Sequence, residues 1–185
     1  MLTPWEKFMG AFWETIKIVV VALIIIIPMR AYVVQPFFVS GASMEPTFNN
    51  GDYLIVDEIS YRFREPSRDE VVVFRFPQDP DQFYIKRIIG LPNEMVEIRD
   101  GDVYIYNEEH PEGFVADQNF FQKVGFTFGN LNVKLGSEEY FVLGDNRGAS
   151  SDSRRWGPLK RDLIVGRVWL RALPVSKAEV FSIPQ

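Results

Sequence analysis

Cysteine is missing from this 185-residue sequence, which excludes disulfide bonds, thiolate nucleophiles and metal sites built on cysteine. Its absence fits an oxidising or a reducing compartment equally well. Basic clusters are missing too. The 25 acidic residues outnumber the 20 lysines and arginines, for a net charge of −5, and no Lys/Arg-rich run occurs. We therefore expect no nucleic-acid partner.

Histidine is almost missing, and this scarcity constrains the chemistry more than any other count. The single histidine, His110, lies in a polar stretch rich in Pro and Gly, which is typical of an exposed loop. A Ser-His-Asp triad would have to use it, and a histidine metal site would have one imidazole. We expect His110 to be a surface residue, any nucleophilic serine to use another base, and the protein to need no metal or cofactor.

One long apolar run is present, from Ile18 to Met29, and it continues past Arg30 to Val34. Counted from residue 16, it reaches the roughly 20 residues that a helix needs to cross a bilayer. Lys17 and Arg30 would reach opposite interfaces. A cleaved secretory signal is one alternative, although no small-x-small site follows the run, and a buried soluble helix is another. We predict a transmembrane anchor over 13–34 after a cytoplasmic segment over 1–12, with an orientation that charge indicates only weakly.

The remaining chain, 35–185, consists of short apolar runs separated by turn residues. Asp100-Gly101 between two such runs is a strong hairpin signal. From about Glu108 to Gly136 the pattern is irregular. These features predict an all-β, mostly antiparallel fold with a smaller inserted lobe at about 95–136. The expected strands lie at Tyr53–Val56, Val71–Phe74, Phe83–Gly90, Met95–Ile98, Val103–Tyr106, Tyr140–Leu143 and Ile164–Leu170.

The stretch from Val39 to Phe48 follows the apolar run and contains a candidate nucleophile. Ser43 lies among small residues that permit a sharp turn, and Met44 and Pro46 follow it. A hydroxyl presented from such a turn beside an apolar wall suits nucleophilic catalysis. Many ordinary loops share this composition, so the interpretation depends on a base elsewhere in the chain.

Lys86 is the candidate base, because it lies in an otherwise apolar strand. In strict alternation, Tyr84 and Lys86 share one face and Ile85 and Arg87 the other. Of the two cations only lysine can lose its proton, and burial lowers its pKa from about 10.4 towards neutrality. A neutral amine can deprotonate a serine, as in known Ser-Lys pairs. The alternative is a solvated lysine at a sheet edge.

A loop rich in turn formers and charges, Gly144 to Gly157, follows a predicted strand. Asp145 with Arg147, and Asp152 with Arg154, are candidate bidentate pairs that would hold the loop rigid. Ser150 is a candidate to orient the lysine amine. The alternative is an ordered surface turn without chemistry.

Four blocks of the sequence together resemble bacterial type I signal peptidases, the membrane-anchored Ser-Lys proteases that remove signal peptides from exported precursors. The resemblance covers most of the chain apart from about 108–136. The blocks are Ser43-Met44-Glu45-Pro46-Thr47, Gly51-Asp52-Tyr53-Leu54-Ile55-Val56, Tyr84-Ile85-Lys86-Arg87-Ile88-Ile89-Gly90-Leu91-Pro92, and Gly144-Asp145-Asn146-Arg147 with Ser150, Asp152, Ser153 and Arg154.

The resemblance implies a role for each matching residue. Ser43 would be the acylated nucleophile, Lys86 its general base and Ser150 the residue that orients the base, while Asp145, Asp152 and Arg154 would maintain the shape of the site. The Ser43 N–H would be one oxyanion donor. Some family members carry a serine two residues before the nucleophile as a second donor, whereas this chain has Gly41 there, so that donor is unidentified.

The resemblance also implies a substrate slot for the small residues of Ala-x-Ala cleavage sites. Two shallow apolar pockets would exclude larger side chains. The first would be lined by Met44, Phe48 and Tyr84, and the second by Phe37, Val39, Leu54, Val73 and Ile85.

The expected protein is a monomer in the bacterial cytoplasmic membrane. Its catalytic domain would face the extracytoplasmic side, and its partners would be preproteins and the lipid bilayer. Two alternatives stay open. One is a related peptidase for a single secreted or pilin substrate, and the other is a catalytically silent, membrane-anchored scaffold.

Overall fold

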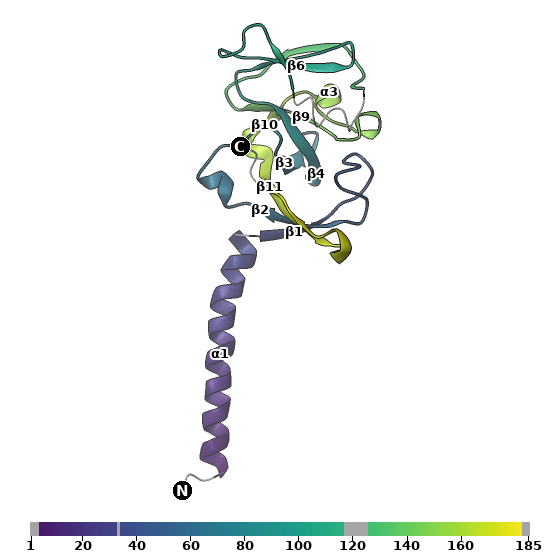
Figure 1. The fold of residues 1–185 in the computed structure, drawn as a ribbon. Coiled ribbons are helices and arrows are strands. Elements are labelled where there is room, and N and C mark those ends of the chain that lie inside the picture. Colours follow the sequence, from purple (N-terminus) through teal and green to yellow (C-terminus); the bar gives the residue numbers. More distant parts are fainter. Residues whose placement is uncertain (1–3, 33, 117–125, 183–185) are drawn as a thin grey trace.

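The computed structural model describes residues 4–32, 34–116 and 126–182. A long helix leads into a β-rich part made of two sheets (Figure 1). The helices are α1 (Pro4–Tyr32) and the short α3 (Ser153–Trp156). The strands are β1 (Val34–Phe38), β2 (Tyr53–Asp57), β3 (Val71–Phe76), β4 (Asp79–Gly90), β5 (Met95–Arg99), β6 (Asp102–Tyr106), β7 (Phe114–Val115), β8 (Leu131–Lys134), β9 (Glu139–Leu143), β10 (Leu159–Lys160), β11 (Ile164–Leu173) and β12 (Glu179–Val180).

The larger sheet has the order β1-β2-β11-β3-β4-β9-β10, with β12 added beside β11. Each strand pairing in the described part of the chain is antiparallel. The predicted all-β, mostly antiparallel fold is therefore confirmed. Strand β4 begins earlier than expected, at Asp79, and contains Pro80. Proline is tolerated there because β9 pairs with β4 only from Arg87 onwards.

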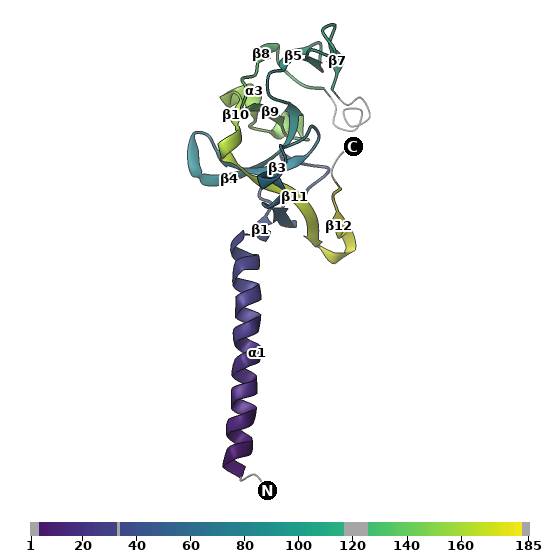
Figure 2. The same cartoon turned by 90° about the vertical axis from the view of Figure 1, so that its left-hand side faces the viewer.

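The smaller sheet has the order β7-β6-β5-β8. The Asp100-Gly101 turn joins β5 to β6, and both turn residues have positive φ, 54° and 91°, as a two-residue hairpin requires. Two strands, β7 and β8, lie where the sequence predicted irregular chain, and residues 117–125 of that stretch are outside the described residues. This sheet lies at the far end of the β-rich part from α1 (Figures 1 and 2). Its treatment as a separate lobe stays a prediction.

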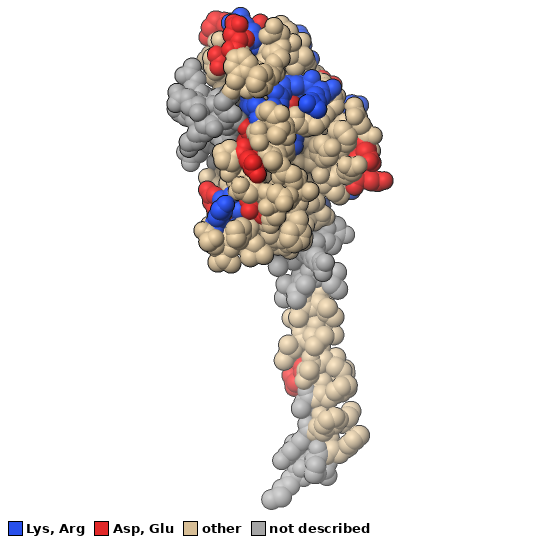
Figure 3. Space-filling model, turned by 90° about the vertical axis from the view of Figure 1, so that its right-hand side faces the viewer, with Lys and Arg blue, Asp and Glu red and all other residues tan. Residues whose placement is uncertain are grey.

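Helix α1 projects away from the sheets, and the surface of its described part is mostly uncharged (Figure 3). Side chains along its middle are exposed, from 47% at Val20 to 69% at Ile18. Within the described residues, however, no helix combines the length and apolar content that crossing a bilayer requires. A helix was expected over 13–34, whereas α1 begins earlier, at Pro4, and ends at Tyr32, with Val34 already in β1; its prediction as a transmembrane span is not confirmed.

The segment that contains Ser43 packs against the larger sheet through an apolar cluster. Met44 and Phe48 are completely buried there and pack with Leu54 and Val56 of β2 and Val73 of β3. Burying side chains of this size stabilises the fold by about 1.5–3 kcal/mol each. The cluster therefore fixes this segment on the sheet, while Ser43 itself is only part-buried.

Candidate active site

Ser43 lies in the loop of residues 39–52 between β1 and β2, called here the Ser43 loop. Hydrogen bonds from Val39 N to Asp52 O and from Gly51 N to Val39 O, both 2.9 Å, close its base. Gly41 has φ +93° and donates its N–H to Asn50 Oδ1 at 2.9 Å. A side chain at this φ would be strained. The turn therefore favours glycine at position 41.

Lys86 lies in the middle of the larger sheet, and its side chain is buried, with 3% of the residue exposed. Its Nζ donates to Ser43 Oγ at 2.8 Å and to the Ile85 carbonyl at 2.7 Å. It also lies 5.4 Å from the centre of the Tyr84 ring. The alternative of a solvated lysine at a sheet edge is therefore wrong.

Burial controls the ionisation of Lys86. Loss of hydration disfavours the ammonium form and lowers the pKa of Lys86 from 10.5 to about 8, although the charges of Asp152 and Asp145 act in the opposite direction. No carboxylate hydrogen-bonds or ion-pairs with Lys86 in the described part of the chain. A usable fraction of the amine is therefore neutral at physiological pH.

The two aspartates nearby are each neutralised by an arginine. Asp152 accepts two bonds of 2.8 Å from Arg154, as expected. Burial alone would raise the pKa of Asp152, but hydrogen bonds and the charge of Arg154 lower it. The bidentate partner of Asp145 is Arg87 of β4, at 2.9 and 2.8 Å.

That second pairing corrects the expectation for Arg147. Arg147 donates to the Gly144 carbonyl at 2.9 Å and to Thr127 Oγ1 at 2.8 Å. Arg87 lies outside the loop, 58 residues from Asp145 in the chain. Pairing across strands of this kind has no local sequence signal.

Ser150 is buried close to Ser43, and both lie against Gly144. A Cβ on Gly144 would meet Ser150 Oγ at 2.2 Å and the Ser43 carbonyl at 2.5 Å, so only glycine fits there. Among the described residues, Ser150 Oγ makes no hydrogen bond to Lys86, whose second bond goes to the Ile85 carbonyl. It lies near the Asp152 carboxylate instead and helps to lower the pKa of that group. The orienting role of Ser150 stays a prediction.

A cleft of about 380 Å³ opens beside Ser43 and Lys86. Six of the eight expected pocket residues line it, and Met44 and Phe48 do not, because they are buried in the cluster beneath the loop. Sequence reasoning missed Phe38, Ser40, Gln82, Phe83 and Ser151, which also line it. Each of these lies within two positions of an expected site residue in the sequence, so closeness to those residues was the one signal that could have predicted them. The six expected lining residues are Phe37, Val39, Leu54, Val73, Tyr84 and Ile85.

His110 lies outside this site, as expected. It is exposed in the loop between β6 and β7, 3.4 Å from Glu112 and beside the Phe114 ring. The histidine therefore contacts the smaller sheet and takes no part in the Ser43–Lys86 arrangement.

Comparison with known proteins identifies the family. A family model described as "Signal peptidase, peptidase S26" matches residues 12–173. The chain belongs to this family. A probable signal peptidase I-2 of Synechocystis sp. is 38% identical over 87% of this chain and 73% of its own length. Signal peptidase IB of Staphylococcus aureus is 32% identical over 89% of this chain and 91% of its own.

One solved structure is also similar, that of a signal peptidase I from Enterococcus faecalis V583. It is 29% identical, with a TM-score of 0.46, over 56% of this chain and 97% of that one. Family and relatives confirm the predicted signal peptidase resemblance and the enzyme class, a serine endopeptidase that cleaves signal peptides.

Proposed function

We propose that Ser43 and Lys86 form the catalytic dyad with which this signal peptidase cuts preproteins. The observation that carries the proposal is the 2.8 Å contact between Lys86 Nζ and Ser43 Oγ at the wall of the cleft. This distance is within reach for direct proton transfer. The burial that holds the pKa of Lys86 near 8 supplies a base suited to working near neutral pH.

The reaction follows from this geometry. The neutral Lys86 amine takes the proton of the Ser43 hydroxyl as Oγ attacks the carbonyl carbon of the scissile peptide bond. The resulting ammonium returns that proton to the leaving amine, which is the new N-terminus of the mature protein. Lys86 then deprotonates a water molecule, which attacks the acyl carbon of the acyl-enzyme. As the ester bond breaks, the Lys86 ammonium returns the proton to Ser43 Oγ, and the signal peptide leaves with a free carboxylate.

The Ser43 N–H is a candidate donor to the developing oxyanion, because no hydrogen bond within the described residues uses it. Gly41 has no side-chain donor, and its N–H is bonded to Asn50 Oδ1, so position 41 does not supply a second donor. Ser40 and Ser151 line the same cleft, so their hydroxyls are the side-chain candidates for that role.

The substrate would bind as an extended strand. The cleft is bounded by the end of β1 and by residues 82–86 of β4, and β4 pairs with β9 only over residues 87–90. The preceding edge of β4 can therefore hydrogen-bond an added peptide. Phe37 and Phe83 contact each other with ring centres 5.3 Å apart, and such bulky walls favour small substrate side chains.

Substitution of the nucleophile tests the dyad. Ser43→Ala should lower cleavage of a preprotein by about a thousandfold or more, with an unchanged unfolding midpoint, because Ser43 is only part-buried. Ser137→Ala, at an exposed position between β8 and β9, is the control and should be fully active. Wild-type rates in Ser43→Ala would refute the dyad.

We also propose that α1 holds the enzyme at a membrane surface with the site on the extracytoplasmic side. The support is the exposed apolar stretch between Ile18 and Ile24, together with Phe38, Leu173 and Val175, which are 72%, 46% and 76% exposed. Patches of this kind mark membrane or protein contacts. In flotation with phosphatidylglycerol vesicles, the wild type should float and an Ile18→Glu/Ile24→Glu variant should float less. A wild type that stays with the soluble fraction would contradict the proposal.

A further inference from the structure

The C-terminal segment of residues 175–181 lies directly behind the Ser43 loop. After β11 the chain makes a short 3₁₀ turn, Val175–Lys177, and returns as β12 antiparallel to β11. Phe181 donates its N–H to the Trp169 carbonyl at 2.8 Å. Its ring packs against Phe48, with centres 4.9 Å apart. Phe48 belongs to the Ser43 loop and is completely buried, so its contact with Phe181 makes the C-terminal segment part of the support of that loop.

Arg171 of β11 connects the segment to the loop. The residue is buried, with 8% exposed, and its guanidinium donates to three groups, one in the Ser43 loop and two in the C-terminal segment. Nη1 bonds the Thr47 carbonyl at 2.6 Å, Nε the Lys177 carbonyl at 2.7 Å and Nη2 the Glu179 carboxylate at 2.5 Å. Asp52, at the end of the same loop, lies 3.6 Å from Nη1.

Thr47 is also held from its other side. Its hydroxyl donates to Asp145 Oδ2 at 2.6 Å, and the Ser43 carbonyl accepts the Asn146 N–H at 3.0 Å. The Ser43 loop is therefore held both by Asp145 and Asn146, which follow β9, and by Arg171 of β11. The carbonyl that Arg171 holds belongs to Thr47, which is only four positions after Ser43 in the chain.

We propose that Arg171 is a positioning residue for the reaction, through which the C-terminal segment keeps the Ser43 hydroxyl at Lys86. The inference rests on the proposed Ser43–Lys86 dyad. A displacement of about 1 Å in a reacting group can lower a rate by about a hundredfold. Arginine suits the role because its rigid fork reaches all three partners at once, whereas a lysine ammonium bonds from a single point.

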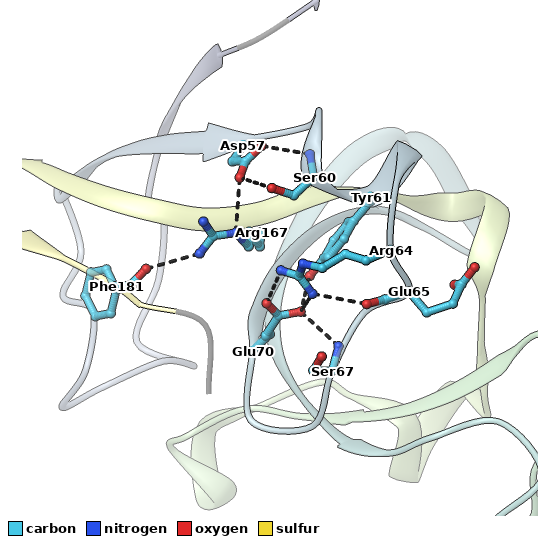
Figure 4. A network of polar contacts seen from close by, with 9 residues as sticks. All are labelled: Asp57, Ser60, Tyr61, Arg64, Glu65, Ser67, Glu70, Arg167 and Phe181. Carbon is cyan, nitrogen blue, oxygen red and sulfur yellow. Dashed lines mark hydrogen bonds and ion pairs between the residues drawn. The ribbon is translucent and has the colours of Figure 1, made fainter. Parts of the chain in front are cut away.

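Arg167 provides a matched control on the same strand. It is as buried as Arg171, with 9% exposed. Its Nε bonds Asp57 at 3.1 Å and its Nη1 bonds the Phe181 carbonyl at 3.1 Å (Figure 4). Like Arg171, Arg167 therefore bonds one carboxylate and one backbone carbonyl of the C-terminal part of the chain, but its carboxylate is Asp57 rather than Glu179. No hydrogen bond or ion pair among the described residues joins it to the Ser43 loop.

The experiment compares Arg171→Met, Arg171→Lys and Arg167→Met by kcat, KM and urea unfolding, using a signal-peptide substrate. Both Met variants should be destabilised to a similar extent. Arg171→Met should lose at least about tenfold in kcat with KM changed by less than about threefold, and Arg171→Lys should recover little of it. Arg167→Met should keep kcat within about threefold. Equal kcat in the two folded Met variants would overturn the inference.

If Arg171→Met does not fold, Phe181→Ala tests the same support from the other partner. It removes the ring that contacts Phe48, and Val180→Ala, at a 62% exposed neighbour, is its control. Only Phe181→Ala should lower kcat, and unchanged kcat would again overturn the inference. Ser43→Ala is measured in parallel. If it stays active, the dyad is wrong, whereas if it is inactive while the Arg171 and Phe181 variants keep kcat, only this inference is wrong.

Discussion

Lys86 and Arg87 are adjacent on β4, and both are buried cations, but their surroundings differ. Lys86 faces the cleft and bonds a hydroxyl and a carbonyl. Arg87 faces the opposite side, lines a second cavity and is bonded twice by Asp145. Arginine is charged at all physiological pH values, so its burial requires such a partner.

The difference suits one strand to carry both the proposed base and a structural ion pair. A carboxylate in contact with Lys86 would stabilise the ammonium and raise its pKa. Here each nearby aspartate is bonded to an arginine, Arg87 or Arg154, and its attraction for Lys86 is weaker than the effect of burial. Alternation along the strand thus places the proposed base and the buried ion pair on opposite faces of the sheet.

Replacing Lys86 by arginine should have the largest effect, because it removes the contrast between the two positions. Lys86→Arg retains the charge but cannot accept a proton, so preprotein cleavage should fall by about a thousandfold or more. Lys160→Arg, at an exposed position on β10, should be fully active. Cleavage at the wild-type rate by Lys86→Arg would remove lysine from the mechanism.

Breaking the Arg87 pair should instead reduce stability. Asp145→Asn leaves a buried guanidinium without its anion, and urea unfolding should show a loss of about 3–5 kcal/mol. The control is Glu65→Gln, which breaks the 2.8 Å pair with Arg161 at a side chain that is 75% exposed. It should cost less than about 1 kcal/mol. Similar losses in both variants would show that burial does not distinguish these pairs.

Removing the amine of Lys86 should increase stability at neutral pH. The pKa of Lys86 is about 8 in the fold and 10.5 as a free group, so unfolding takes up a proton between these values and stability rises with pH there. Below pH 8 the buried lysine costs about 3 kcal/mol. Lys86→Met should therefore be up to about that much more stable at pH 7, and the gain should shrink above pH 8. A gain independent of pH would contradict the shifted pKa.

The sequence predicted this arrangement unevenly, for physical reasons. Local patterns were sufficient for seven of the twelve strands in the described residues, for the Asp100-Gly101 hairpin and for singling out a lysine in an apolar strand, whereas β1, β7, β8, β10 and β12 were not predicted. The Asp152–Arg154 pair lies within one turn and could also be predicted. The Asp145–Arg87 and Arg171–Thr47 contacts join residues 58 and 124 positions apart, and only the folded sheet brings them together. For Met44 and Phe48, the sequence does not distinguish the wall of a pocket from the apolar core, and the structure buries both residues in the core.

The pH dependence of the rate should show the smallest effect, but it tests the ionisation of Lys86 most directly. Only the neutral amine accepts a proton, so kcat/KM should rise with pH, reach half its maximum near the pKa of about 8 and level off above it. At pH 7 about one tenth of the amine is neutral, so the rate should be roughly tenfold below the plateau. Asp145→Asn, where it folds, removes one of the charges that raise the pKa of Lys86 and should move the midpoint to lower pH. A midpoint near 10.5, or one that does not move in this variant, would mean that the observed titration is not that of a buried Lys86.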